Sequence, residues 1–389
     1  MNNALWIILI VYFLVTVPVL GFDLYHWLID RYCRFHIGRW KDDNTWFERV
    51  FNVAAGWLPN PPTVQTSNHT RLLLLDKMTG KSGLGRVQSW QTAGLILGVR
   101  EFSERLPDCF HEQCAHFFIN GDGMWKKPPA HIDNAMLAYA LLKVTEQPET
   151  IQPAMDYIAE LIEQRIGADG LVAYSNVRSN LRYVDTLGLI CPFLALYGKI
   201  YAKPGCVDLA CKQIMDFNHH GLLGDTFLPN HAFDAKTKLP IGVYGWGRGT
   251  GWYAIALLDT YQELPSSRTK QTLKDTIRSA AEGYKGYQRN DGGFGIIIQD
   301  LNSAYDSSAT AVIAYFYSVC HEIFGHEDYL DISRACVKKL KSVTRLTGKI
   351  DYCQGDTKDV GIFSQLSGPM PFAQGFALRA YAKCLKADL

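Results

Sequence analysis

Hydrophobic and polar positions alternate with a helical period along most of this chain of 389 residues. From about residue 87 onward, apolar side chains recur at the three- and four-residue spacing of helices that bury one face. Only Gly295–Gln299, with its three isoleucines, has the composition of a strand. No linker rich in Ser, Pro or charge divides the pattern, so it predicts one helical domain. The expected helices are 87–106, 132–146, 149–166, 184–201, 205–217, 250–263, 269–288, 306–323, 327–342 and 370–386.

Every second one of these helices begins in a similar way, which indicates an internal repeat. A polar or glycine-rich start leads into an unusually apolar helix, and successive starts lie about 40 to 65 residues apart, the length of two helices with their loops. The helices between them are more amphipathic, residues 269–288 most clearly. Six buried helices alternating with six half-exposed ones predict an all-α fold, an (α/α)6 barrel. The six starts are Ser89–Gly94, His131–Met136, Tyr183–Gly188, Gly247–Gly251, Tyr305–Ala309 and Gly368–Phe372.

Helix starts that meet at one mouth of such a barrel gather chemistry-bearing side chains around one pocket. Asp133 and Asp185 are the candidate acid–base pair, because two carboxylates in an enclosed site separate their pKa values and leave one protonated near neutral pH. An Asp at a helix start is more often an N-cap than a catalyst, so both roles remain open. The side chains expected at the mouth are Trp90, Asp133, Asp185, Arg248 and Asp306.

The segment Val243–Asp259, VYGWGRGTGWYAIALLD, has a glycine at alternate positions and fits the loose dinucleotide fingerprint G-x-G-x-x-A from Gly249. A dinucleotide loop follows a strand, whereas a polar segment, 234–242, precedes this motif, and the Walker lysine is absent. We therefore expect a loop whose glycines let the backbone approach a ligand. Arg matches a carboxylate and Trp offers a flat apolar face, although two core Trp and a surface Arg are the simpler alternative. The side chains expected to face the ligand are Trp246, Arg248 and Trp252.

The N-terminal run Ala4–Phe22 contains 19 residues without a charge, close to the ~20 that cross a bilayer. It lacks the basic start and small-residue cleavage site of a signal peptide, so an uncleaved single-pass anchor is expected. An atypical signal peptide and a buried N-terminal helix are the alternatives. The positive-inside rule places the body in the cytoplasm, because basic residues follow the run and none precedes it. These are Arg31, Arg34, Arg39 and Lys41.

The amino-acid composition limits which ligands and partners the chain is expected to bind. A net charge of +1 gives no general attraction to nucleic acid. The ten cysteines lack C-x-x-C or zinc spacing and are expected to be reduced, whereas disulfides within Cys109/Cys114 and Cys206/Cys211 would favour an exported body. The pair His219–His220 has no third ligand nearby in sequence, so no metal site is predicted. An aromatic content of 12% suits a protein that stacks sugar rings.

The segment WGRGTGWYAIALLD resembles the signature of the unsaturated glycuronyl hydrolases, specifically glycoside hydrolase family 105, the unsaturated rhamnogalacturonyl hydrolases, with family 88 as close kin. HIDNAMLAYALL resembles the family's helix with its first active-site Asp, here Asp133, and YVDTLGLICPFLALYG resembles the helix of the catalytic Asp, here Asp185. HAFDAKT resembles the loop with a substrate-binding His, here His231. Asp306 departs from the family's usual Glu-Thr-Ser-Gly. The resemblance covers roughly residues 85 to 386.

This resemblance implies an (α/α)6 barrel that removes a 4,5-unsaturated uronic acid from the non-reducing end of lyase-generated oligosaccharides. Asp185 then protonates the vinyl ether and activates water, and Asp133 orients substrate or water; no metal or organic cofactor is implied. The implied substrate-binding residues are Trp90, His231, Trp246, Arg248 and Trp252. The expected organisation is an anchor at 1–30, an extension packed on the barrel at 31–85 and the catalytic barrel at 86–389, with the oligomeric state left open.

Two other functions compete with hydrolysis. Gln288–Gly295 resembles the Q-x-x-D-G-G-F-G repeat of membrane-associated terpene cyclases and prenyltransferases, although D-G-G is also an ordinary tight turn. A non-catalytic glycan-binding module is the third possibility, and it predicts loss of Asp133 or Asp185, both of which are present.

Overall fold

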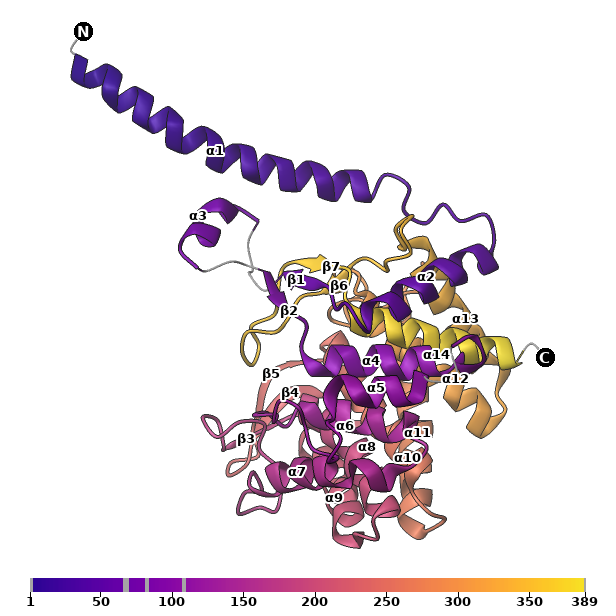
Figure 1. Ribbon diagram of the computed structural model, residues 1–389. Helices are drawn as coiled ribbons and strands as arrows, with labels where there is room; N and C mark the ends of the chain where they lie inside the picture. Colours follow the sequence, from indigo (N-terminus) through magenta and orange to yellow (C-terminus); the bar gives the residue numbers. More distant parts are fainter. Residues whose placement is uncertain (1–2, 66–69, 81–83, 107–109, 388–389) are drawn as a thin grey trace.

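Six buried helices form a closed ring at the centre of the protein (Figure 1). The structure is a computed structural model that describes residues 3–65, 70–80, 84–106 and 110–387. Each ring helix packs against the next, and the last packs back against the first, as the repeat in the sequence predicts. Nearly all their residues are buried, which explains their uniformly apolar sequences. The ring helices are α4 (Ser89–Arg100), α6 (Asn134–Val144), α8 (Val184–Ile200), α10 (Gly247–Glu263), α12 (Ser307–Phe324) and α14 (Pro371–Ala387).

An outer layer of amphipathic helices covers this ring. Helix α11 buries one stripe, which includes Leu273, Ile277 and Tyr284, and leaves its charged residues in solvent. Helix α2 packs on α14 and α4, and its apolar positions from Trp46 to Trp57 also follow a helical period. The sequence analysis missed α2 and α5. The outer helices are α2 (Asp43–Trp57), α5 (Phe110–Phe118), α7 (Gln152–Glu163), α9 (Pro204–His220), α11 (Arg268–Lys285) and α13 (Glu327–Ser342).

Short antiparallel strands connect the helices at one end of the ring. The largest sheet has the order β3 (Leu181–Tyr183), β4 (Asn230–Asp234) and β5 (Pro240–Tyr244), and β3 leads directly into α8. The expected strand at 295–299 is wrong, because this segment makes only isolated bridges through Gly295 and Ile297 between turns. The other pairs are β1 (Thr63–Gln65) with β2 (Leu84–Arg86), and β6 (Cys353–Gln354) with β7 (Ser367–Gly368).

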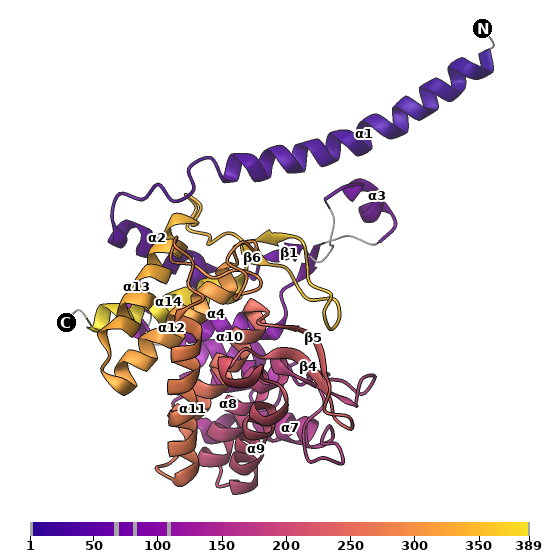
Figure 2. The same cartoon turned by 180° about the vertical axis from the view of Figure 1, so that it is seen from behind.

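Helix α1 (Asn3–Cys33) projects away from the ring, with α3 (Leu73–Met78) beside it (Figures 1 and 2). Within the described residues, Ala4–Cys33 is the one helix long and apolar enough to cross a membrane, and its most apolar part is 6% buried. The chain just after α1 is tied to the body, because Nε of Arg34 donates to Oδ2 of the buried Asp351 at 2.8 Å. The segment that follows α1 and the barrel are therefore in direct contact.

The cysteines of the described residues are free thiols. Cys206 and Cys211, five residues apart, are not joined, and Cys114 is buried and free. Cys109 lies outside the described residues. None of these described cysteines is joined in a disulfide, and the reduced state of the thiols stays a prediction.

Candidate active site

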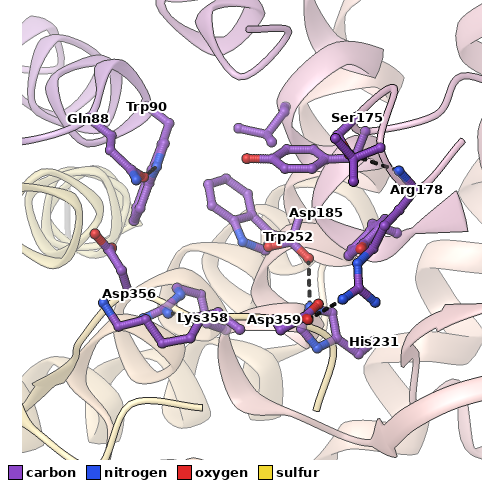
Figure 3. Close-up of a pocket in the computed structure, with 16 residues that line it drawn as sticks. Gln88, Trp90, Ser175, Arg178, Asp185, His231, Trp252, Asp356, Lys358 and Asp359 are labelled. Carbon is purple, nitrogen blue, oxygen red and sulfur yellow. Dashed lines mark hydrogen bonds and ion pairs between the residues drawn. The ribbon is translucent and has the colours of Figure 1, made fainter. Parts of the chain in front are cut away.

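The sheet and the ring bring Asp185 and His231 together. Tyr183 in β3 pairs with Ala232 in β4. Asp185 lies two residues after Tyr183, and His231 lies directly before Ala232. Nε2 of His231 lies 3.5 Å from Oδ2 of Asp185, the contact drawn in Figure 3. Residues 46 positions apart in sequence therefore meet through one strand pairing.

The carboxyl group of Asp185 is held in its protonated form more strongly than an ordinary aspartic acid. Its Oδ2 atom is buried and accepts no hydrogen bond. Burial raises the pKa of Asp185, while His231, Arg248 and a hydrogen bond from the Trp252 side chain oppose that shift without cancelling it. A carboxyl with a raised pKa is suited to donate a proton near neutral pH.

His231 has a defined tautomer in this structure. Its Nδ1 atom accepts a hydrogen bond from the backbone N–H of Gly361 at 3.1 Å, so in the neutral ring the proton resides on Nε2 and faces Asp185. The ring packs against Phe363 and Trp246, with centroid distances of 5.4 and 4.7 Å. Burial lowers the pKa of His231, which favours the neutral ring. His231 is thus a neutral ring whose Nε2–H faces Oδ2 of Asp185 without forming a hydrogen bond to it.

The three aspartates at the helix starts have different roles. Asp306 accepts hydrogen bonds from the backbone N–H groups of Ser308 and Ala309, and it therefore caps α12 and does not line the pocket. Asp133 occupies the N-cap position of α6 without making a side-chain cap bond. Burial raises the pKa of Asp133, as it does for Asp185. The cap interpretation thus holds for Asp306, while neither Asp133 nor Asp185 is used as a cap.

A cavity of about 330 Å³ opens beside Asp185, within the size range of small-molecule sites. Of the expected site residues, Trp90, Asp185, His231, Arg248 and Trp252 line it, whereas Asp133 and Trp246 do not. Burial, followed by the charges of Asp133 and Asp185, raises the pKa of Tyr174, which lines the cavity. The sequence analysis missed further lining residues, among them Gln88, Tyr174, Arg178, Asp356, Lys358 and Asp359.

Aromatic rings form one wall of the cavity. Trp90 and Trp252 meet edge to face with centroids 5.3 Å apart. Phe372 packs behind both at 5.1 and 5.0 Å. Such rigid apolar faces suit the C–H faces of a sugar ring.

The side chains of the glycine motif hold a loop of the cavity wall. Arg248 donates from Nη1 to the carbonyl oxygen of Gln354 at 2.6 Å and from Nη2 to that of Gly355 at 2.8 Å. Nε1 of Trp246 donates to Oε1 of Gln354 at 2.9 Å. Trp246 is 1% exposed and lies behind His231, which corrects the expectation that it faces the ligand. These contacts position residues 354–359, which carry Asp356.

The glycines of this motif allow close packing within the protein. A Cβ atom on Gly247 would lie 2.4 Å from the carbonyl oxygen of Gly295, and one on Gly249 would lie 2.7 Å from the Trp246 ring. This corrects the expectation that they admit a ligand. The preceding segment contains a strand, β5, contrary to the sequence interpretation, but that strand is antiparallel to β4. The described residues therefore lack the parallel β-α-β unit of a dinucleotide site.

The segment Gln288–Gly295, which suggested a terpene cyclase repeat, forms a turn after α11. The N–H of Gly292 donates to the carbonyl of Arg289 at 2.8 Å, and Gly292 has a φ of +85°. A positive φ requires glycine in such a turn. The interpretation as a tight turn is confirmed.

A closed ring of six buried helices covered by six outer helices defines the (α/α)6 barrel architecture. Residues 110–386 match the model of Glycosyl Hydrolase Family 88, and the chain belongs to this family. This assignment confirms the resemblance to the unsaturated glycuronyl hydrolases and replaces the terpene cyclase alternative.

Solved structures show the same fold at low sequence identity. A possible member of family 105 from Klebsiella pneumoniae aligns with a TM-score of 0.72 at 14% identity, over 90% of this chain and 95% of that one. A family 105 glycoside hydrolase from C. acetobutylicum aligns with a TM-score of 0.65 at 18% identity, over 83% of this chain and 100% of that one. An unsaturated glucuronyl hydrolase from Bacillus sp. GL1 aligns with a TM-score of 0.62 at 18% identity, over 89% of this chain and 96% of that one. That enzyme is described as responsible for the degradation of glycosaminoglycan.

Proposed function

We propose that this glycoside hydrolase removes a 4,5-unsaturated uronic acid from the non-reducing end of oligosaccharides produced by polysaccharide lyases. The observation that carries the proposal is the contact between Asp185, whose pKa is raised, and the neutral His231 at the edge of an aromatic-walled cavity. The names of similar structures, among them an unsaturated glucuronyl hydrolase, support the same substrate class.

In the proposed reaction Asp185 acts first as an acid and then as a base. Its carboxyl proton goes to C4 of the double bond, and positive charge develops at C5 and the ring oxygen. Water adds to C5 and returns one proton to the Asp185 carboxylate, which leaves a hemiketal. Opening of the hemiketal breaks the bond between C5 and the ring oxygen and leaves a ketone at C5 and a hemiacetal at C1. Collapse of this hemiacetal to an aldehyde releases the neighbouring sugar as an alcohol, so one water is consumed and the anomeric carbon is not displaced directly.

The surrounding groups support this proton transfer. The Nε2–H of His231 stabilises the Asp185 carboxylate that forms when the proton leaves. We assign Asp133 to orienting substrate or water, because it is buried near Tyr174 in the cavity wall. Trp90 and Trp252 hold the sugar faces, and Arg248 contributes positive charge for the uronate while it holds its loop.

The test follows the ultraviolet absorbance of the conjugated uronate. Oligosaccharides generated by lyases from rhamnogalacturonan, chondroitin and heparin form the panel. Loss of absorbance with the wild-type protein, and none with Asp185→Asn, supports hydrolysis. Binding in calorimetry with unchanged absorbance across the panel contradicts it and favours a glycan-binding module.

We also propose that residues 4–22 anchor the protein in a membrane as a single span, with residues 31–85 as an extension on the barrel of residues 86–389. The basic residues after the span favour a cytoplasmic body. Protease protection in sealed vesicles tests the orientation, since a cytoplasmic body is digested in inside-out vesicles and protected in right-side-out ones.

A further inference from the structure

We propose that α3 is a second membrane contact, which lies in the bilayer interface beside α1 and holds the barrel against the membrane surface. This goes beyond the proposed hydrolysis and rests on the proposed insertion of residues 4–22. The partner is the lipid bilayer itself.

The apolar side chains of α3 are exposed to an unusual degree. Leu72, at the start of the helix, is 49% exposed, and Leu75 and Met78 are 39% and 74% exposed. A spacing of three residues places Leu75 and Met78 on one face of the helix, and Leu72 is the residue just before its first turn. No residue within α3 is buried, so this short helix has little packing to stabilise it in water. A bilayer surface would cover that face.

A direct contact places α3 at the level where the span ends. Asp23 is the first charged residue after the uncharged run Ala4–Phe22. Its Oδ2 and Oδ1 atoms accept hydrogen bonds from the backbone N–H groups of Leu72 and Leu73, at 2.7 and 3.0 Å. Because a charged residue that closes a span lies at the water interface, α3 lies there as well.

The residues around this contact match the chemistry of a lipid interface. Tyr25, Trp27 and Tyr32 on the following part of α1 are exposed, and Trp and Tyr are enriched where bilayer and water meet. Lys77 is an exposed basic residue of α3, as suits anionic lipid headgroups. An aqueous protein partner explains the apolar face but not its attachment to the end of an uncharged span.

The views from both sides show α3 next to α1 and away from the ring (Figures 1 and 2). The N-terminal half of α1 and the sheet β3–β5 extend from the ring on the same side. The cavity includes Tyr183 of that sheet and His231. A barrel held by both α1 and α3 therefore has its active site on the side nearest the bilayer.

Photocrosslinking tests this placement in the full chain. The photoreactive residue p-benzoylphenylalanine replaces Met78 in α3, Ile7 in α1 or Leu385 near the C-terminus, one position at a time. Each protein is reconstituted in vesicles of phosphatidylcholine and phosphatidylglycerol that contain a biotinylated phospholipid. We expect phospholipid adducts at Ile7 and Met78 and at least tenfold less adduct at Leu385.

Each alternative outcome overturns the inference in a distinct way. Adducts at Ile7 without adducts at Met78 show a span with no second contact. Absence of adducts at Ile7 removes the insertion on which the inference rests, while the absorbance assay still tests hydrolysis separately. Protein–protein adducts at Met78 in place of lipid adducts show a protein partner.

A matched pair of variants makes the result specific to the apolar face. In the Met78 photoprobe background, Leu75→Glu places a charge on that face and is expected to reduce lipid adducts at least fivefold. Lys77→Gln makes the same change of −1 in net charge without altering the apolar face, and it is expected to reduce lipid adducts less than Leu75→Glu does. Equal reductions by the two variants contradict insertion of the apolar face.

Discussion

Nε2 of His231 lies 3.5 Å from Oδ2 of Asp185, while Nδ1 of the same ring accepts a hydrogen bond from the N–H of Gly361. The Gly361 bond depends on an unprotonated Nδ1, so protonation of His231 would break it. Burial favours the uncharged forms of both side chains. The pair thus places a carboxyl group with a raised pKa next to a fixed N–H donor, the arrangement that the proposed reaction needs from its acid.

Replacing Asp185 by Asn should remove catalysis and preserve the fold. Positioned proton transfer contributes roughly 10²–10⁴-fold, and kcat/KM is expected to fall by at least this factor. The thermal midpoint should stay within a few degrees, because Oδ2 accepts no hydrogen bond that Asn would lose. Steady-state absorbance assays and thermal unfolding measure the two effects. Near-normal kcat/KM in Asp185→Asn would assign the chemistry to another residue.

The pH profile should show an alkaline limb that belongs to Asp185. The first step uses the protonated carboxyl, so kcat/KM falls as the pH rises through the raised pKa of Asp185. His231→Gln removes a group that favours the charged form, and the limb should therefore move to higher pH. Arg248 and Tyr174, which also face this carboxyl, are unchanged in the variant. A limb that moves to lower pH contradicts the assignment.

The raised pKa of Asp185 also makes the free energy of unfolding depend on pH, in a direction that can be stated. The folded-state pKa of Asp185 lies above the unfolded value, so its neutral form contributes stability at pH values below the unfolded pKa. That contribution is lost as the pH rises through the folded pKa. Denaturant unfolding of the wild type and Asp185→Asn across this range measures it, and the stability difference between them should change in this window.

The ring helices could be predicted from the sequence because their pattern is local. A helix that is apolar on all sides is buried, and six of them with similar starts indicate a ring. The motif WGRGTGWYAIALLD, which contains Arg248, is also a local pattern, and it was enough to indicate the family. The loop at 354–359 could not be predicted, because its position depends on hydrogen bonds from Arg248, which is more than a hundred residues away in sequence.

The aspartates show a second limit of sequence interpretation. Asp133 and Asp306 both stand at helix starts, and sequence alone does not separate a cap from a free carboxyl. The backbone conformation determines which of the two is a cap. Asp306 is extended, with φ −131° and ψ 117°, and its side chain accepts hydrogen bonds from the first N–H groups of α12. Asp133 is already helical, with φ −59° and ψ −20°, and makes no such bond. An N-cap needs the extended conformation.

Asp356 is expected to select among substrates. Figure 3 shows it beside Gln88 and Trp90, across the cavity from Asp185. Its Oδ1 is buried without a partner, so a sulfate or carboxylate on the sugar next to the uronate meets an unpaired carboxylate oxygen. Asp356→Asn should lower KM for such substrates about fivefold, roughly 1 kcal/mol of like-charge repulsion, and change KM little for neutral ones.

The matched control for Asp356 is Asp359→Asn. Asp359 also lines the cavity, but it forms an ion pair with Arg178 and is therefore already neutralised. We expect no lowering of KM for sulfated oligosaccharides in this variant. Equal changes in the two variants would show that total charge, and not the position of Asp356, determines the preference.

Arg248→Lys should loosen the cavity wall while conserving charge. A lysine ammonium is a single point donor and cannot reproduce the planar contacts of Arg248 with the Gln354 and Gly355 carbonyls. Hydrogen bonds to charged groups contribute about 1.5–3 kcal/mol, so kcat/KM should fall about ten- to a hundredfold. Hydrogen exchange of residues 353–363 should accelerate in the variant. Unchanged exchange with reduced activity would instead indicate direct substrate binding by Arg248.

Arg34→Ala should weaken the connection between the segment that follows α1 and the cavity wall. Arg34 donates to both carboxylate oxygens of Asp351 and lies over the Tyr352 ring at 5.0 Å. Arg345 also donates to Asp351, so the variant leaves this buried carboxylate with one cationic partner. The free energy of unfolding should fall by about 1.5–3 kcal/mol.

Asp351→Ala should have a larger effect, because it removes the buried acceptor of both Arg34 and Arg345 and leaves them only Asp30, whose side chain is 41% exposed; a loss of about 3 kcal/mol is expected. Asp351 is followed within three residues by Gln354, which Arg248 holds, so KM should rise in both variants. Thermal unfolding and the absorbance assay measure the two effects. Arg31→Ala is the control, because Arg31 contacts only the nearby Trp27 ring among its described interactions. If Arg34→Ala behaves like Arg31→Ala, the chain after α1 is not coupled to the cavity wall.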